Sequence, residues 1–124
     1  MARYFTVEEA NAMLDVIRPL MREILDIRQV IFQKQPEVIP VLNRLLDNGG
    51  SQAASQVALE IEQLHVLIGH LLATGVALKD INSGLVDFLS QRDGRDVYLC
   101  WRYGEESVAY WHELETGFAG RKPI

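Results

Sequence analysis

Residues 84–112 read GLVDFLSQRDGRDVYLCWRYGEESVAYWH, a run of short segments rich in β-branched and aromatic side chains. The segments at 84–88, 97–102 and 108–112 are separated by two turn-like segments that contain Asp-Gly and Gly-Glu. β-Branched and aromatic residues favour strands, whereas glycine and aspartate favour the turns that join them. This part of the chain therefore predicts a small antiparallel β-meander.

The chain before residue 76 follows a helical period instead. Its apolar residues recur four and three positions apart, which is the spacing of amphipathic helices that pack against each other. One series consists of Met13, Ile17, Leu20, Ile24, Ile27 and Ile31, widened by Leu14, Met21 and Leu25, and the other of Val57, Ile61, Leu64, Ile68 and Leu71. Two long helices with matching apolar seams are expected to fold back on each other as an antiparallel pair.

Local signals mark where the first helix begins, bends and ends. Thr6 and Glu9 have the spacing of a capping box, so the helix is expected to begin there. Pro19 removes one backbone hydrogen bond and is expected to kink the helix near Ile17 without breaking it. The pair Gln35-Pro36 is expected to end it.

The connection and the second helix have their own signals. Ser51 is expected to cap the start of the second helix, and Gly75 is expected to end it in a left-handed conformation. Between the helices the sequence predicts a loop at Asn48-Gly49-Gly50 and, before it, a short amphipathic piece with Val38, Val41, Leu42, Leu45 and Leu46 on one side.

Helices followed by strands predict an α+β fold. A long antiparallel helical hairpin, residues 6–75, is expected to pack against a small antiparallel β-meander with a C-terminal tail, residues 76–124. The length of 124 residues suits one domain, so residues 1–124 are interpreted as a single unit. Within the tail, Gly117–Ile124 is expected to be neither helix nor strand.

The composition excludes several classes of protein. The net charge is −5, and phosphate recognition needs clustered Lys and Arg, so we expect no nucleic-acid partner. The most apolar stretch, Leu64–Leu78, is too short to span a bilayer, and the first residues lack a signal-peptide pattern. Cys100 is the only cysteine, which excludes an intrachain disulfide and any CxxC motif. A soluble, cytoplasmic protein without a membrane partner is therefore expected.

Several short motifs occur in a distinctive order. They are Tyr4-Phe-Thr-Val-Glu-Glu-Ala-Asn11 at the start, followed by Gly84-Leu-Val-Asp-Phe88, Asp93-Gly-Arg95, Leu99-Cys-Trp101, Gly104-Glu105, Trp111-His112 and Gly117-Phe-Ala-Gly-Arg121. With these motifs the chain resembles, over nearly its whole length, a bacterial family catalogued as a domain of unknown function, number 2203. The resemblance implies no particular activity, because none is firmly assigned to that family.

The candidate functional residues gather in the meander. If the turn after the second strand spans residues 103–107, Cys100 lies opposite Tyr110 and Tyr98 lies opposite His112. One face of the sheet then carries Tyr98, Cys100, Arg102, Tyr110 and His112. A two-residue turn would regroup these side chains, because a shift of one residue moves each of them to the other face. Such a mixture of imidazole, thiol, guanidinium and phenol groups suits a small anionic ligand or a metal ion. His112 is equally interpretable as a buried, hydrogen-bonded structural residue.

Asp87 lies in an otherwise apolar segment and needs a partner, because burying an unpaired carboxylate is costly. One interpretation is an ion pair with Arg95, Arg102 or Arg121. The other joins Asp87 to His112, with Glu105 or Glu113 nearby, as a metal ligand or an acid–base pair. The candidate ligand-binding residues are therefore Asp87, Arg102, Glu105, His112 and Arg121, and the candidate metal ligands are Asp87 and His112.

Two further residues admit two interpretations each. Cys100 is either a thiol activated by Arg102 or a small buried hydrophobic residue. Arg121 is either an anion clamp above the sheet or part of a tail that Phe118 pins to the core. His65 and His70 are five positions apart on a helix, which places them on different sides of it.

These residues favour a protein that binds a small anionic ligand or a metal ion at the C-terminal sheet. The alternative is a non-catalytic, homo-oligomeric scaffold, a dimer above all, built on the hairpin. That alternative is motivated by apolar residues beside the main seam, namely Met21, Leu25, Val30 and Phe32. A hydrolase with His112 as base and Asp87 as its orienting group ranks last, because the chain contains no nucleophile elbow, P-loop or dinucleotide fingerprint. The sequence specifies neither a cofactor nor a catalytic residue.

Overall fold

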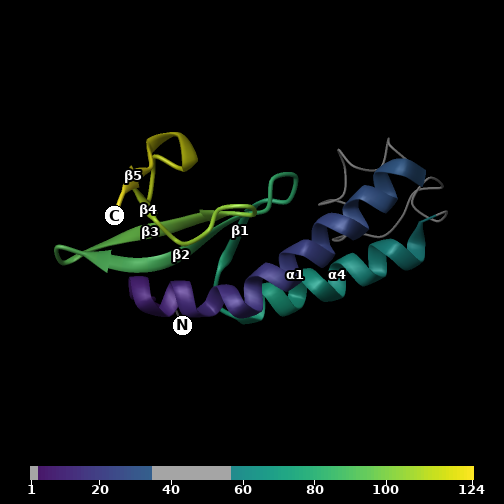
Figure 1. Ribbon diagram of the computed structural model, residues 1–124, viewed down its shortest axis with the longest axis horizontal. Helices are drawn as coiled ribbons and strands as arrows, with labels where there is room; N and C mark the ends of the chain where they lie inside the picture. The colour runs from purple at the N-terminus through teal and green to yellow at the C-terminus, as the bar shows by residue number, and fades with distance from the viewer. Residues whose placement is uncertain (1–2, 35–56) are drawn as a thin grey trace.

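The computed structural model describes residues 3–34 and 57–124. Within these residues the elements are α1 (Val7–Lys34), α4 (Ala58–Ala73), β1 (Ala77–Asp80), β2 (Leu85–Arg92), β3 (Arg95–Arg102), β4 (Tyr110–Glu113), a 3₁₀ turn η2 (Phe118–Gly120) and β5 (Lys122–Pro123). The strands form one antiparallel sheet in the order β1-β2-β3-β4-β5. Figure 1 shows α1 and α4 packed side by side next to the sheet. The predicted α+β fold is therefore confirmed.

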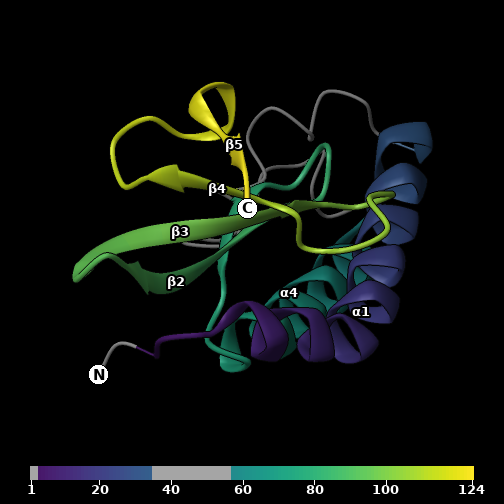
Figure 2. The same cartoon turned by 60° about the vertical axis from the view of Figure 1, so that its left-hand side comes forward.

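The first helix begins and bends as expected. The Glu9 N–H donates to Oγ1 of Thr6 over 3.0 Å, and the Thr6 N–H donates to Oε1 of Glu9 over 2.8 Å, which completes the capping box. Pro19 lies inside α1. The axis of α1 changes direction between its first turns and the rest of the helix (Figures 1 and 2). The proline is therefore accommodated by a bend, as a missing backbone hydrogen bond allows.

The buried side of α1 is shifted relative to the predicted seam. Its buried residues are Ala10, Leu14, Ile17, Met21, Ile24 and Ile31. Met13, Leu20 and Ile27 are only partly buried. The shift arises because α1 packs against both α4 and the sheet, so the centre of its apolar side is directed at the boundary between them. Met21 belongs to this core and is not a surplus surface residue, whereas Val30 and Phe32 are exposed.

The second helix ends as predicted. Gly75 has φ +98°, and its N–H donates to the carbonyl of Leu72 over 3.0 Å. Val57 and Leu64 are buried, and His65 and His70 are exposed. The expected cap at Ser51, the end of the first helix at residues 35–36, the amphipathic piece at 38–46 and the loop at 48–50 lie outside the described residues. Neither described helix is long and apolar enough to cross a bilayer.

The sheet has more strands than the three predicted. β1 was missed because it has only four residues, of which two are charged, and β5 because it has only two. The expectation that Gly117–Ile124 has no regular structure is wrong, since η2 and β5 both lie within it. β5 pairs with β4 at the edge of the sheet, where a proline is tolerated because no N–H is needed on its outer side.

The two faces of the sheet have different surroundings. The face toward α1 carries the apolar core, whose strand residues are Val86, Phe88, Val97, Leu99, Trp101 and Trp111. The C-terminal segment and the first turns of α1 lie on opposite sides of the sheet (Figures 1 and 2). The opposite face of the sheet therefore points toward the C-terminal segment. The pairing of Tyr98 with His112 and of Cys100 with Tyr110 is the register expected for a turn at 103–107. The candidate residues on this face therefore lie outside the apolar core.

Candidate metal centre

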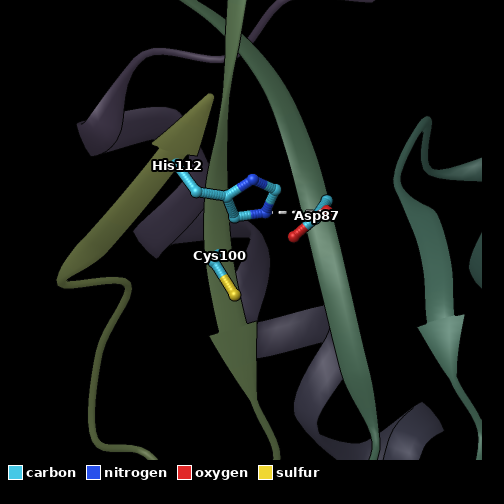
Figure 3. A group of neighbouring side chains, drawn as sticks. All are labelled: Asp87, Cys100 and His112. Atoms are coloured by element: carbon cyan, nitrogen blue, oxygen red, sulfur yellow. Dashed lines mark hydrogen bonds and ion pairs between the residues drawn. The ribbon is translucent and has the colours of Figure 1, made fainter. Parts of the chain in front are cut away.

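Asp87, Cys100 and His112 meet on the face of the sheet turned away from α1. They belong to β2, β3 and β4, and the Cα pairs Asp87–Cys100 and Tyr98–His112 place all three side chains on one side. One ligand atom from each residue lies within 4.8 Å of the other two, and each residue is at most 2% exposed (Figure 3). The structure thus brings the two predicted metal ligands together and adds Cys100 to them.

Hydrogen bonds determine which nitrogen of His112 carries a hydrogen. Nδ1 lies 2.7 Å from the carbonyl oxygen of Glu113, which can only accept, so Nδ1 donates. Nε2 lies 3.1 Å from Oδ2 of Asp87 (Figure 3). Two lone pairs would repel at this distance, so either a proton or a cation must lie between the two atoms. A metal-bound histidine commonly donates its other N–H to a carbonyl in this way.

The other carboxylate oxygen of Asp87 has no partner among residues 3–34 and 57–124. Oδ1 is buried and accepts no hydrogen bond from the described residues. Leaving such an atom unsatisfied costs about 1–3 kcal/mol, and more where the group is charged. An unpaired oxygen next to a thiol and an imidazole nitrogen is the environment of a cation rather than of an anion.

The partner of Asp87 is therefore a histidine and not an arginine. The interpretation of Asp87 as half of an Asp–Arg pair is wrong, because among the described residues Asp87 pairs with His112 and each candidate arginine lies elsewhere, Arg102 beside Phe118. Arg95 bonds Glu113 over 2.7 Å at the surface, and Arg121 pairs with Glu105. His112 is consistent with a structural, hydrogen-bonded residue as well as with a ligand, since both ring nitrogens have partners.

Cys100 is a buried thiol whose pKa is raised rather than lowered. Burial raises the pKa of the Cys100 thiol to about 11. By smaller amounts, the hydrogen bond and charge of Arg121 lower this pKa, and the charge of Asp87 and a hydrogen bond to Asp87 raise it. The predicted activation by Arg102 is wrong because the Arg102 side chain is exposed and points toward Phe118. Of the two interpretations of Cys100, the buried one is confirmed. Its proton can still be displaced by a metal ion, which binds the thiolate.

Arg121 and Glu105 form a second layer above the cluster. Nη1 of Arg121 donates to Oε1 of Glu105 over 3.0 Å, and Nη2 bonds the other carboxylate oxygen. Nη1 also lies 3.7 Å from Sγ of Cys100. Burial acts to raise the pKa of Glu105, but the bonds from Arg121 and from the Arg102 N–H outweigh it, so the pKa lies below its usual value. Arg121 thus reaches over the sheet, where it meets the carboxylate of Glu105.

Of the candidate ligand-binding residues, Arg102 alone is left outside this arrangement. The guanidinium of Arg102 is exposed and lies 5.2 Å from the centre of the Phe118 ring. The others, Asp87, Glu105, His112 and Arg121, surround Cys100 through the contacts given above. Glu113 contributes its backbone carbonyl to His112, while its side chain binds Arg95.

Sequence reasoning did not include Cys100 among the candidate metal ligands, although a signal for its place beside Asp87 exists. Asp93 and Gly94 have φ values of 54° and 79°, which are typical of a two-residue hairpin turn. An Asp-Gly pair between two apolar segments predicts such a turn, with Arg92 opposite Arg95. Counting back along both strands then places Asp87 opposite Cys100.

A separate groove lies between α1 and α4. Its volume is about 570 Å³, and none of the candidate residues line it. Its apolar part consists of Ile27, Leu59, Val66 and Leu67, and its polar part of Glu23, Asp26, Glu62 and Gln63. Among the described residues that line the groove there is neither a nucleophile nor a histidine. Self-association of the helical hairpin stays a prediction.

Comparison with known proteins identifies a family but no characterised relative. No curated protein and no solved structure matches the chain. A family model described as "Uncharacterized conserved protein (DUF2203)" matches residues 3–124, which include the capping box, Asp87, Cys100, His112 and Arg121. The chain belongs to this family of uncharacterised conserved proteins.

Proposed function

We propose that this protein binds one divalent transition-metal ion of the zinc class through Asp87, Cys100 and His112. The observation that carries the proposal is the unpaired, buried Oδ1 of Asp87 beside a thiol and a histidine whose Nδ1 already donates to a carbonyl. All three donor types are ordinary ligands of Zn²⁺. A thiolate among the donors favours zinc or another thiophilic metal over magnesium or calcium.

The spacing of the donor atoms supports a single ion. Tetrahedral zinc with bonds of about 2.0–2.3 Å places its ligand atoms roughly 3.3–3.8 Å apart. In the structure Nε2 of His112 and Oδ2 of Asp87 are 3.1 Å apart, and the ligand atoms of the cluster lie within 4.8 Å of one another. Small side-chain movements therefore suffice for binding, and three protein ligands leave one position for water or a further ligand.

Charge balance supports a divalent ion. Asp87 as carboxylate and Cys100 as thiolate contribute two negative charges, and His112 is neutral when its Nε2 binds a metal. The adjacent pair of Arg121 and Glu105 is neutral as a whole. A divalent ion thus leaves no net charge buried at the site, which matters because an unbalanced buried charge is costly.

The same contacts favour a cation over the small anionic ligand. The cationic group at the cluster is Arg121, and its two terminal nitrogens already bond Glu105. An anion here would have to displace that carboxylate and also lie beside the carboxylate of Asp87. Metal binding requires neither change.

The test is to load the purified full chain with Co²⁺ in place of zinc and record its absorption spectrum. Because Cys100 is the only cysteine, any thiolate-to-cobalt charge-transfer band must come from this residue. We expect one ion per chain and the loss of the band in Cys100→Ser. The exposed His70 supplies a matched control, since His70→Gln is expected to keep both the ion and the band.

A second measurement guards against variants that fold poorly. Zinc at a hundredfold excess over its dissociation constant is expected to raise the free energy of unfolding of the unaltered chain by ~2.7 kcal/mol. A chain that binds no cobalt and gains no stability from zinc contradicts the proposal. So does a cobalt spectrum that is the same in Cys100→Ser.

A further inference from the structure

Arg121 is held above Cys100 more tightly than a surface arginine needs to be. Its guanidinium carbon lies 4.1 Å from the centre of the Tyr110 ring and 4.3 Å from that of Phe118. Both terminal nitrogens bond Glu105, and the side chains of Arg121 and Glu105 are only 14% and 18% exposed. Two aromatic rings and a carboxylate thus fix the position of the guanidinium.

This fixed position directs one N–H at the sulfur of Cys100. Nη1 of Arg121 lies 3.7 Å from Sγ of Cys100, and the same nitrogen donates to Oε1 of Glu105 over 3.0 Å. Glu105 is itself anchored, because its Oε1 accepts from the backbone N–H of Arg102 over 2.8 Å. β5 also helps, since it pairs with β4 directly after Arg121.

We propose that Arg121, positioned by Glu105, is an outer-sphere residue of the metal site that donates a hydrogen bond to the Cys100 thiolate. The inference rests on the proposed metal site and assigns Arg121 the role of a positioning residue. A hydrogen bond to a metal-bound thiolate withdraws electron density from sulfur and holds the ligand in place. Arg121 therefore sets how strongly sulfur donates to the ion and how tightly the ion is held.

The role depends on the fork of the guanidinium. Its planar N–H groups reach the Glu105 carboxylate and the sulfur together while the plane lies against the two rings. A lysine ammonium is a single point charge without a plane, so it keeps the positive charge and the ion pair but cannot make all these contacts at once. Arg121→Lys thus removes the hydrogen bond to sulfur while it keeps the positive charge.

Arg102 provides a matched control. It lies two residues from Cys100 on β3, and its guanidinium is also near Phe118, at 5.2 Å from the ring centre. It is exposed and makes no bond to the sulfur. Arg102→Lys therefore makes the same arginine-to-lysine change near the Phe118 ring without removing a contact to Cys100.

The experiment compares cobalt-loaded chains of the unaltered protein, Arg121→Lys and Arg102→Lys. We expect Arg121→Lys to shift the sulfur-to-cobalt band to longer wavelength, because an electron leaves a thiolate more easily when its hydrogen bond is gone. We also expect it to weaken metal binding by about tenfold or more, the usual loss for an outer-sphere partner. Arg102→Lys is expected to change neither property.

Glu105→Gln serves as a second variant that loosens Arg121 without altering it. It is expected to shift the band in the same direction by a smaller amount. A bound ion with an unchanged band and affinity in both Arg121→Lys and Glu105→Gln overturns the role of Arg121 and leaves the metal site standing. Absence of cobalt binding in the unaltered chain overturns the metal site itself, and the role of Arg121 with it.

Discussion

Nε2 of His112 lies 3.1 Å from Oδ2 of Asp87, although their strands, β4 and β2, are not neighbours in the sheet. The two side chains meet across β3, above Cys100 (Figure 3). This bridge over the central strand is what turns three separate polar residues into one site.

The bridge between Asp87 and His112 is expected to be energetically coupled. Asp87→Ala leaves a buried imidazole nitrogen without its partner, and removing one member of a buried pair costs about 3–5 kcal/mol. In urea unfolding without metal, the double variant Asp87→Ala with His112→Ala should therefore cost less than the sum of the two single variants. The expected coupling is ~0.5–3 kcal/mol. Strictly additive costs would show that the two residues act independently.

The affinity for zinc is expected to rise with pH. The metal binds the thiolate, and burial raises the pKa of the Cys100 thiol to about 11, so near neutral pH the proton must be displaced. As long as the pH is below this pKa, each rise of one pH unit then increases the zinc affinity by up to about tenfold through the thiol alone. Competition with a chromophoric chelator at several pH values near neutrality measures this slope. An affinity independent of pH would exclude Cys100 as a ligand.

The same thiol should be unreactive in the folded, metal-free chain. At neutral pH a thiol with a pKa of about 11 is ionised in only about one molecule in ten thousand, and Cys100 is fully buried as well. Its reaction with a disulfide reagent should therefore be slow in buffer and become fast when the chain is unfolded in urea. Fast reaction of the folded chain would contradict the burial of Cys100.

The ion pair of Glu105 and Arg121 is expected to contribute to stability at neutral pH but not in acid. The pKa of Glu105 in the folded chain lies below its usual value, so its contribution is present above the unfolded pKa and is lost as the pH falls through the folded one. Glu105→Gln should accordingly lower the free energy of unfolding at neutral pH and converge with the unaltered chain in acid.

Glu113 is a control for this pH effect. Its pKa is also lowered, by Arg95, but the side chains of Glu113 and Arg95 are 33% and 52% exposed, far more than those of Glu105 and Arg121. Exposed ion pairs contribute little, so Glu113→Gln should change the pH dependence of stability much less than Glu105→Gln. Equal effects of the two variants would indicate that burial of the Glu105 pair is unimportant.

Two glycines at α4 should respond in opposite directions to alanine. Gly75 has φ +98°, and a Cβ there would lie 2.8 Å from Cδ of Arg3, so Gly75→Ala should cost about 1–3 kcal/mol. Gly69 lies inside the helix, and no described residue comes within 4 Å of a Cβ placed there, so Gly69→Ala should stabilise the chain by about 0.5–1 kcal/mol. Thermal unfolding of the two variants checks both signs, and a stabilising Gly75→Ala would contradict the left-handed cap.

The sequence by itself determined the features that depend on local chemistry and periodicity. The capping box at Thr6 and Glu9 and the left-handed end of the second helix at Gly75 follow from neighbouring residues. These features are predictable because their energy comes from contacts within a few residues along the chain. The register that pairs Tyr98 with His112 was one of two that the sequence allowed, and the structure selected it.

Tertiary structure alone decided which polar groups meet. Asp87 pairs with His112 rather than with an arginine, Arg121 pairs with Glu105, and β5 closes the edge of the sheet. Each of these contacts joins residues that are distant in sequence or on different strands, and several partners of suitable charge compete for each position. The choice among them depends on how the strands align and what they bury, because a buried polar group must take the partner within its reach.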